Sequence, residues 1–343
     1  MPLPNPDLFK TPQKYEPIYG GIQFGGEEGT QTIRPSSTAL FCISSEDRYD
    51  NVGIERAVSG QTSPYRFTIT KKESLLNGFF TRMALTEIKF PWTLPNVSAF
   101  AFTNLIGITC GTDSHVITIP DKFYTAPELA AAITSVWNTL YTTNTILMQV
   151  SPNYNDDSFL LTPVTEGSLV AIYPAGVDTT PSLPLNTYQL VDMMGFVNVN
   201  SIPASSQLSF STPNLLWTEY VDIVSNDLTY NQALKDSSSS QASRDLIYRI
   251  YLTEGQPSYN YPKTIAEQNT YFGVLPYGTR PFVIYRQFQN PKEIRWNKQQ
   301  PIGQVTFEVY DDKGRNLADL FGTTSYGNVY SADWNMTMLV SEN

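Results

Sequence analysis

Short stretches rich in β-branched and aromatic residues recur through the first and last thirds of this 343-residue chain. In the stretch YRFTIT, Tyr65, Phe67 and Ile69 alternate with polar residues, which is the pattern of a strand that buries one face. The same criteria predict strands at Thr38–Ser44, Phe79–Phe90, Leu215–Val224, Asp245–Leu252, Thr279–Gln287, Glu293–Trp296, Gln304–Tyr310 and Met336–Val340. The last of these, MTMLV, is apolar enough to be buried on both faces. Two groups of strands predict a mainly β, antiparallel fold.

The middle third has a different pattern. Thr125 and Glu128 form a capping box around Pro127, and this combination marks the start of a helix. The apolar residues that follow fall on one helical stripe: Leu129, Ala132, Ile133, Val136, Trp137 and Leu140. A short helix over Thr187–Met194 should end at Gly195. Strands are predicted at Ile106–Thr109, Val116–Ile119, Ile146–Val150 and Phe159–Pro163.

These patterns predict one β-sandwich or barrel that is interrupted by a small α+β module. We expect an extended N-terminal arm at residues 1–37, the β-rich core at 38–100 and 201–343, and the inserted module at 101–200. Within the last part, Asp311-Asp312-Lys313-Gly314 predicts a hairpin turn with a left-handed glycine and solvated carboxylates.

The composition indicates a protein that buries part of its surface against partner proteins. Charged residues make up only 16% of the chain, while 21 residues are tyrosine, a side chain that is enriched at protein interfaces. The formal net charge is -10 and no basic run occurs, so direct binding to nucleic acid is not expected. No apolar run is long enough to span a membrane, and the N-terminus has no secretory signal pattern.

The N-terminal arm, Met1–Ser37, combines breakers of regular structure with large apolar residues. Its prolines and glycines predict an extended segment. Its apolar residues are more numerous than a solvated tail needs, and two explanations remain open: the arm lies on a neighbouring subunit, or it packs on its own domain. The candidate partner contacts are Leu8, Phe9, Tyr15, Ile18 and Tyr19.

Residues that could carry catalysis are scarce. The chain has one histidine, His115, at the start of a predicted strand, with no nucleophile motif beside it. Cys42 and Cys110 are too few for a disulfide framework or a zinc site, and both are expected to be buried as small apolar residues. We therefore predict no catalytic residue, no metal site, no cofactor and no enzymatic activity.

Three weaker alternatives stay open from the residues alone. Two carboxylates that are distant in the sequence, such as Glu87 and Asp222, could form the catalytic pair of a glycosidase, although no motif supports this alternative. A calcium ion could bind in the loop Asn153–Asp157. The five tryptophans are expected in the core, with a sugar-stacking platform as the sharper alternative.

Several passages resemble the penton (vertex) capsid proteins of polinton-like viruses, virophages and related eukaryotic DNA viruses. The resemblance covers about a third of the chain and rests on Arg82–Val97, Ile117–Ile133, Leu228–Leu252, Pro291–Leu317 and the closing DWNMTMLVSEN. It implies an antiparallel jelly-roll β-sandwich with an insertion. The Arg-Gly-Asp loop that the adenovirus vertex protein uses for cell entry does not occur in this sequence.

The resemblance also implies a function. The chain would be a structural virion protein, made in the host cytoplasm. It would form homopentamers that close the fivefold vertices of an icosahedral capsid, with the major capsid protein as its second partner. The alternatives are a minor or cement capsid protein of another stoichiometry, and a glycan- or receptor-binding virion module.

Overall fold

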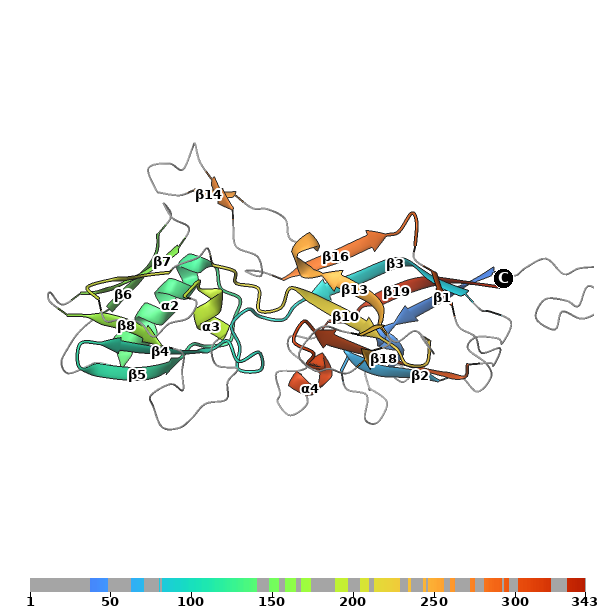
Figure 1. The fold of residues 1–343 in the computed structure, drawn as a ribbon, viewed down its shortest axis with the longest axis horizontal. Coiled ribbons are helices and arrows are strands. Elements are labelled where there is room, and N and C mark those ends of the chain that lie inside the picture. The colour runs from blue at the N-terminus through green and yellow to red at the C-terminus, as the bar shows by residue number, and fades with distance from the viewer. Residues whose placement is uncertain are drawn as a thin grey trace, which may run out of the picture.

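A computed structural model of the chain describes residues 38–48, 63–70, 80, 82–140, 148–153, 158–164, 168–173, 189–196, 204–209, 213–228, 234–235, 243–244, 246–255, 260–262, 272–274, 281–291, 293–295, 302–321 and 332–342. Figure 1 shows an elongated molecule, with a β-sandwich at one end and the helix α2 with several short strands at the other.

The first sheet of the sandwich has the strand order β1-β19-β3-β16. Its strands are β1 (Thr38–Ser44), β19 (Asn335–Ser341), β3 (Arg82–Trp92), β16 (Phe282–Gln287) and β17 (Glu293–Arg295). Gln287 of β16 pairs with Glu87, and Glu293 of β17 pairs with Ala84. Because β16 and β17 follow one another along the same edge of β3, they form a single interrupted strand.

The second sheet has the order β13-β10-β18-β2, and every neighbouring pair in both sheets is antiparallel. Its strands are β13 (Leu246–Tyr251), β10 (Tyr220–Val224), β18 (Gln304–Asp311) and β2 (Arg66–Thr70). When the sandwich strands are numbered in chain order, with β16 and β17 as one, the sheets have the orders 1-8-3-6 and 5-4-7-2. The antiparallel β-sandwich expected from the sequence is therefore confirmed.

Aromatic residues fill the space between the two sheets. Phe67 of β2 lies 5.4 Å from Phe307 of β18, and both contact Trp334, which precedes β19. Buried and half-buried residues alternate along β18, as expected for a strand with one face in the core. The predicted core placement of the tryptophans is confirmed for Trp92, Trp137, Trp217 and Trp334, which are all buried; Trp296 lies outside the described residues.

The inserted region lies between β3 and β10. It has one sheet in the order β5-β4-β8 and another in the order β6-β7-β9. The strands are β4 (Leu105–Cys110), β5 (Asp113–Thr118), β8 (Val170–Tyr173), β6 (Met148–Asn153), β7 (Ser158–Pro163) and β9 (Gln207–Leu208). The helix α2 (Ala126–Thr139) contacts β5 and β6, and α3 (Gln189–Met193) contacts β4.

The ends of both helices are set by local sequence, as predicted. The side chain of Thr125 accepts from the Glu128 N–H, and the Glu128 carboxylate accepts from the Thr125 N–H, so the capping box is present. Gly195 has φ 86°, the left-handed conformation that ends α3. One residue of the predicted stripe differs: Leu140 is exposed, because the helix ends at Thr139 and Leu140 is its C-cap.

The turn after β18 was only partly predicted. Gly314 has φ 82°, and the Asp311 N–H donates to the Arg315 carbonyl, so the tight turn and its left-handed glycine are confirmed. The chain then enters the short helix α4 (Leu317–Phe321) and not a second hairpin strand. The smaller elements are η1 (Ser45–Arg48), η3 (Leu252–Gly255) and the strand pairs β11 (Leu234–Lys235) with β12 (Ser243–Arg244) and β14 (Asn260–Pro262) with β15 (Phe272–Val274).

Candidate interaction surfaces

The outer face of the second sheet carries a bidentate ion pair. Arg249 of β13 donates from Nε and Nη2 to the two carboxylate oxygens of Asp222 on β10, at 2.7 and 2.8 Å. Asp222 is buried, and the Arg249 guanidinium also stacks 3.7 Å from the Tyr220 ring centroid. The hydrogen bond to Asp222 raises the pKa of Arg249. This geometry makes the pair a strong one, because two parallel charged hydrogen bonds act in a partly dehydrated site.

A second network continues across β18 to β2 on the same face. Glu308 accepts from the Tyr310 hydroxyl and from Arg66 Nε, each at 2.9 Å. Arg66 also donates to both carboxylate oxygens of Asp319 at 2.7 and 3.0 Å, and this contact raises the pKa of Arg66. The outer face of the second sheet is therefore cross-linked by polar groups that already have partners.

The outer face of the first sheet exposes large apolar residues among polar ones. Leu40 of β1 lies directly opposite Leu339 of β19, and Leu339 lies opposite Ala84 of β3, so three apolar residues form one row across the sheet. Leu40 is 66% exposed and Leu339 is 36% exposed. Large apolar side chains that are exposed side by side make this part of the sheet a candidate interaction surface. We call Leu40, Leu339 and Ala84 the apolar row.

Apolar side chains are also exposed on β16, the strand at the opposite edge of this sheet from β1. Val283 and Tyr285 of β16 are 51% and 57% exposed, and they pair with Pro91 and Lys89 of β3. The Tyr285 hydroxyl hydrogen-bonds to Glu87, which raises the pKa of the phenol. Charges of both signs border the apolar residues and include the ion pair between Arg82 and Glu293 at 3.5 Å.

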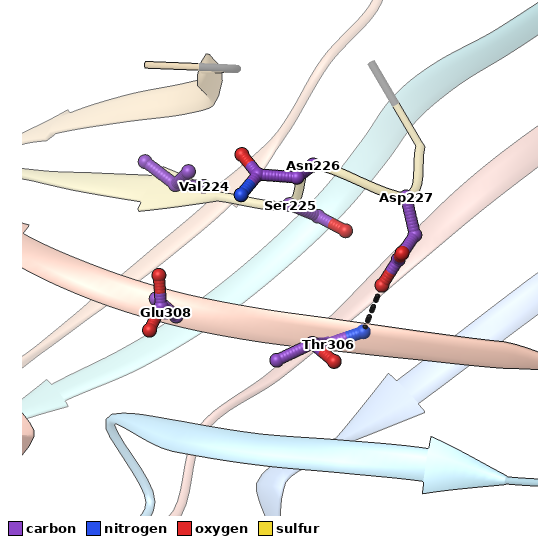
Figure 2. A pocket seen from close by; sticks show the side chains of 6 residues that line it. All are labelled: Val224, Ser225, Asn226, Asp227, Thr306 and Glu308. Carbon is purple, nitrogen blue, oxygen red and sulfur yellow. Dashed lines mark hydrogen bonds between the residues drawn. The ribbon is translucent and has the colours of Figure 1, made fainter. Parts of the chain in front are cut away.

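A small polar hollow of about 230 Å³ lies where β10 ends beside β18 (Figure 2). It is lined by Val224, Ser225, Asn226, Asp227, Thr306 and Glu308. The Asp227 carboxylate accepts from the Thr306 N–H at 2.7 Å, and the Glu308 carboxylate accepts from Arg66 and Tyr310. Both acids therefore already hold structural partners on or beside β18 and are not paired for acid–base chemistry.

The junction between the sandwich and the inserted region is built around Trp217. Its rings lie 5.6 Å from Trp92 and 6.3 Å from Phe100, and its carbonyl accepts from Lys313 Nζ at 2.9 Å. The buried apolar cluster of the molecule runs through these residues from one part to the other. Trp217 therefore joins the turn after β18 to the start of the insertion.

The expectation of solvated turn carboxylates is wrong for Asp311. Asp311 is fully buried and accepts from the Lys313 and Arg315 N–H groups at 3.0 and 2.7 Å and from Arg315 Nε at 2.7 Å. The tight turn folds its own donors back onto this carboxylate and thereby replaces the water that we had expected.

The cysteines and the histidine lie in different environments. Cys110 is buried, as predicted, and burial raises the pKa of its thiol to about 11. The prediction is wrong for Cys42, which is exposed because it lies two residues after Leu40 on the same face of β1. His115 is exposed on β5 and faces the Trp137 ring edge-on at 6.1 Å.

The structure does not bring the candidate carboxylate pair together. Asp222 belongs to the second sheet and is held by Arg249, whereas Glu87 belongs to the first sheet and contacts Tyr285. Packed sheets lie about 10 Å apart, so a glycosidase pair of these two residues is excluded. The calcium alternative falls mostly on residues 154–157, outside the described residues, and the predicted arm contacts Leu8, Phe9, Tyr15, Ile18 and Tyr19 also lie outside them.

Within the described ranges, no group of three or more histidine, cysteine, aspartate or glutamate side chains could hold a metal ion. A helix that is long and apolar enough to cross a membrane is likewise not found in that part of the chain. Trp137, the tryptophan of the inserted region, lies on α2 and is fully buried, so it cannot serve as an exposed stacking platform.

Sequence reasoning missed the apolar row, although a signal for it was present. The stretch TALFCIS has apolar residues at consecutive positions 39–43, so alternation alone does not say which ones face the core. MTMLV could have been buried on both faces from its sequence; in the structure its outward Leu339 is exposed and Thr337 is half-buried.

No family model matches the chain, and a search of curated proteins gives no match. A search of solved structures finds the crystal structure of the penton protein of mavirus, with a TM-score of 0.46 and 11% sequence identity. The alignment covers 90% of this chain and 100% of that chain. The similarity is a distant one.

Proposed function

We propose that this protein is a structural component of a virus capsid whose sandwich is covered by other protein copies in the particle. The single observation that carries the proposal is the exposed apolar row on the outer face of the sheet β1-β19-β3-β16, while the second outer face carries polar groups that are already paired. Exposed apolar residues that lie together mark a surface that binds another molecule, and a subunit of an assembly buries such a surface against its neighbours.

The strand orders 1-8-3-6 and 5-4-7-2 support a narrower proposal. Strands that are distant in the chain pair in each sheet, as in a double-sheet jelly roll, an architecture that viral capsid domains use. Four of the stretches that resemble penton proteins include strands of this framework: Arg82–Val97 holds β3, Leu228–Leu252 holds β13, Pro291–Leu317 holds β17 and β18, and the closing segment holds β19. Fold alone does not fix function, so the strand order supports the capsid role but does not carry it.

We propose further that the protein is a homopentamer at the fivefold vertices of an icosahedral DNA-virus particle. A closed ring of heterologous contacts needs two different complementary surfaces on each subunit. In this proposal, residues 1–37 form an arm, 38–100 and 201–343 form the jelly roll, and 101–200 form an inserted module. The major capsid protein is the second partner, and the protein catalyses no reaction.

Imaging of the purified full chain tests the vertex proposal. Negative-stain class averages should show rings with fivefold symmetry. Threefold particles would move the protein to another position in the shell, and single subunits at all concentrations would contradict self-assembly.

Particle incorporation tests the role of the arm. Deletion of Met1–Gly21 should leave the thermal unfolding midpoint unchanged and reduce incorporation when the variant is produced together with the major capsid protein. Normal incorporation of the truncated chain would contradict a partner role for Leu8, Phe9, Tyr15, Ile18 and Tyr19. The matched control is the full-length chain with Thr70→Glu, an exposed change on the second sheet.

A further inference from the structure

We propose that the outer face of the sheet β1-β19-β3-β16 is the docking site for the N-terminal arm of a neighbouring copy of this chain. This inference rests on the proposed homo-oligomer and names the surface that receives the arm. Its centre is the apolar row, with Cys42 beside it on β1.

The size of the face favours a narrow occupant. Seven residues of β1 or β19 span about 24 Å, and four strands about 4.8 Å apart give an area on the order of 450 Å². A stable interface between two globular surfaces buries about 800 Å² on each partner. The face is too small for that, but its length fits an extended segment of about seven residues laid along the strands.

The edge of the sheet provides a second mode of attachment. β1 is the outermost strand, and among the described strands it pairs with β19 alone. An extended segment that adds to an open sheet edge gains main-chain hydrogen bonds, while its alternate side chains reach the adjoining face. Leu40 and Cys42 are the β1 side chains that such a segment would meet.

The arm has the composition that this site requires. It ends directly before Thr38, the first residue of β1, and it contains the apolar residues Leu8, Phe9 and Ile18. The charges in its first 20 residues balance, with Lys10 and Lys14 against Asp7 and Glu16. The receiving face also carries charges of both signs, so docking brings no excess of like charge together.

A neighbouring copy fits better than the chain's own arm. Residues 25–37 separate the apolar part of the arm from β1, and 13 residues can span about 45 Å. The longest sandwich strand, β3, has 11 residues and is about 37 Å long, so the arm can pass beyond its own sandwich. An arm that binds the next subunit also makes the heterologous contact that closes a ring.

Disulfide trapping tests the docking directly, because the receiving face already carries an exposed thiol. Thr11→Cys and Gln13→Cys each place a thiol among the apolar arm residues and leave those residues in place. The full-length variants are oxidised with diamide, which accepts the two electrons and two protons as the disulfide forms. Cys110 does not compete because it is buried. We expect links to Cys42 between copies, visible as a ladder of covalent oligomers on a denaturing, non-reducing gel.

Two controls define the specificity of the link. Cys42→Ser should abolish the ladder. Moving the receiving thiol to the second sheet, with Cys42→Ser and Thr70→Cys combined, should give no ladder because Thr70 lies on the other outer face. Leu40→Glu should lower the linked fraction about tenfold or more, since it places a charge in the apolar contact, whereas Thr70→Glu should leave the fraction unchanged.

The outcomes separate this inference from the proposed function. Links found by peptide mass only within one copy would overturn the neighbouring-copy assignment. Fivefold rings without any link to Cys42 would overturn the docking site and leave the vertex role standing. Links between copies in an assembly without fivefold symmetry would support the docking site and contradict the vertex role.

Discussion

The two outer faces of the sandwich use the same antiparallel pairing but differ in what they expose. On the second sheet, Arg249 and Asp222 form a bidentate pair, and Glu308 accepts from Arg66 and Tyr310. On the first sheet, Leu40 and Leu339 lie on paired positions of neighbouring strands, and both side chains are exposed to solvent.

In the proposed assembly, this difference would decide which face meets water. Polar groups with fixed partners keep a face stable in solvent and leave little for a partner to bind. Exposed leucines gain free energy when they are covered, at roughly 25 cal/mol for each Å² of apolar surface removed from water. We infer that the first sheet faces protein and the second faces solvent or a weakly bound neighbour.

Adjacent residues of β1 should show the largest contrast. Phe41 points into the core and Leu40 points outward. Phe41→Ala should lower the free energy of unfolding by about 3 kcal/mol, whereas Leu40→Ala should change it by less than about 0.5 kcal/mol. Urea denaturation of the dilute chain measures both. Equal losses would mean that Leu40 is part of the core.

Asp222→Ala should be nearly as costly, because it leaves Arg249 without its partner on a half-buried face. We expect a loss of about 3 kcal/mol in the free energy of unfolding, with no change in the oligomeric state. The double variant with Arg249→Ala should recover part of that loss. A loss below about 1 kcal/mol for Asp222→Ala would show that the second face does not depend on this pair.

Arg66→Ala should have a smaller effect, since Arg66 and Asp319 are both exposed. The expected loss is at most about 1 kcal/mol, and it should shrink as salt is added because exposed ion pairs are screened. Thermal unfolding at low and high ionic strength measures this. A loss that is independent of salt would indicate a packing role for the arginine stem.

Substitution of the exposed cysteine should have the smallest effect on stability. The rate at which its thiol is labelled should show most directly whether assembly covers the first sheet. Cys42→Ser should change the free energy of unfolding by less than about 0.5 kcal/mol. In the dissociated chain, Cys42 should react with a thiol reagent and Cys110 should not, because burial raises the pKa of Cys110 to about 11. Assembly should slow the labelling of Cys42. Equal labelling rates before and after assembly would contradict coverage of the first sheet.

Features set by local sequence were predictable from the sequence. Which side chains are exposed on the outer faces of the two sheets was not. The capping box of Thr125 and Glu128 and the left-handed Gly314 depend on neighbours a few residues away, and both were found as predicted. The pairing of β1 with β19 joins residues about 300 positions apart, and no local pattern encodes that pairing. Leu40 and Cys42 lie on the outward face of β1, and the expectation that Cys42 is buried came from the usual burial of free cysteines, which does not depend on the face of a strand.

The burial of Asp311 was missed for a related reason. Adjacent acids in a turn are normally solvated, and the sequence does not reveal that the turn folds back on Trp217 and that Arg315 reaches the carboxylate. Candidate contacts in the arm remain a prediction.

Whether assembly covers the outer face of the first sheet is tested most directly by the mass of the full-length chain in solution. Native mass spectrometry would compare the unchanged protein with Leu40→Glu and Thr70→Glu. We expect a species of about five times the 38.5 kDa chain for the unchanged protein and for Thr70→Glu, and mainly single chains for Leu40→Glu. A monomer for all three, or an oligomer that Leu40→Glu leaves intact, would contradict the claim that the first sheet is the face that assembly covers.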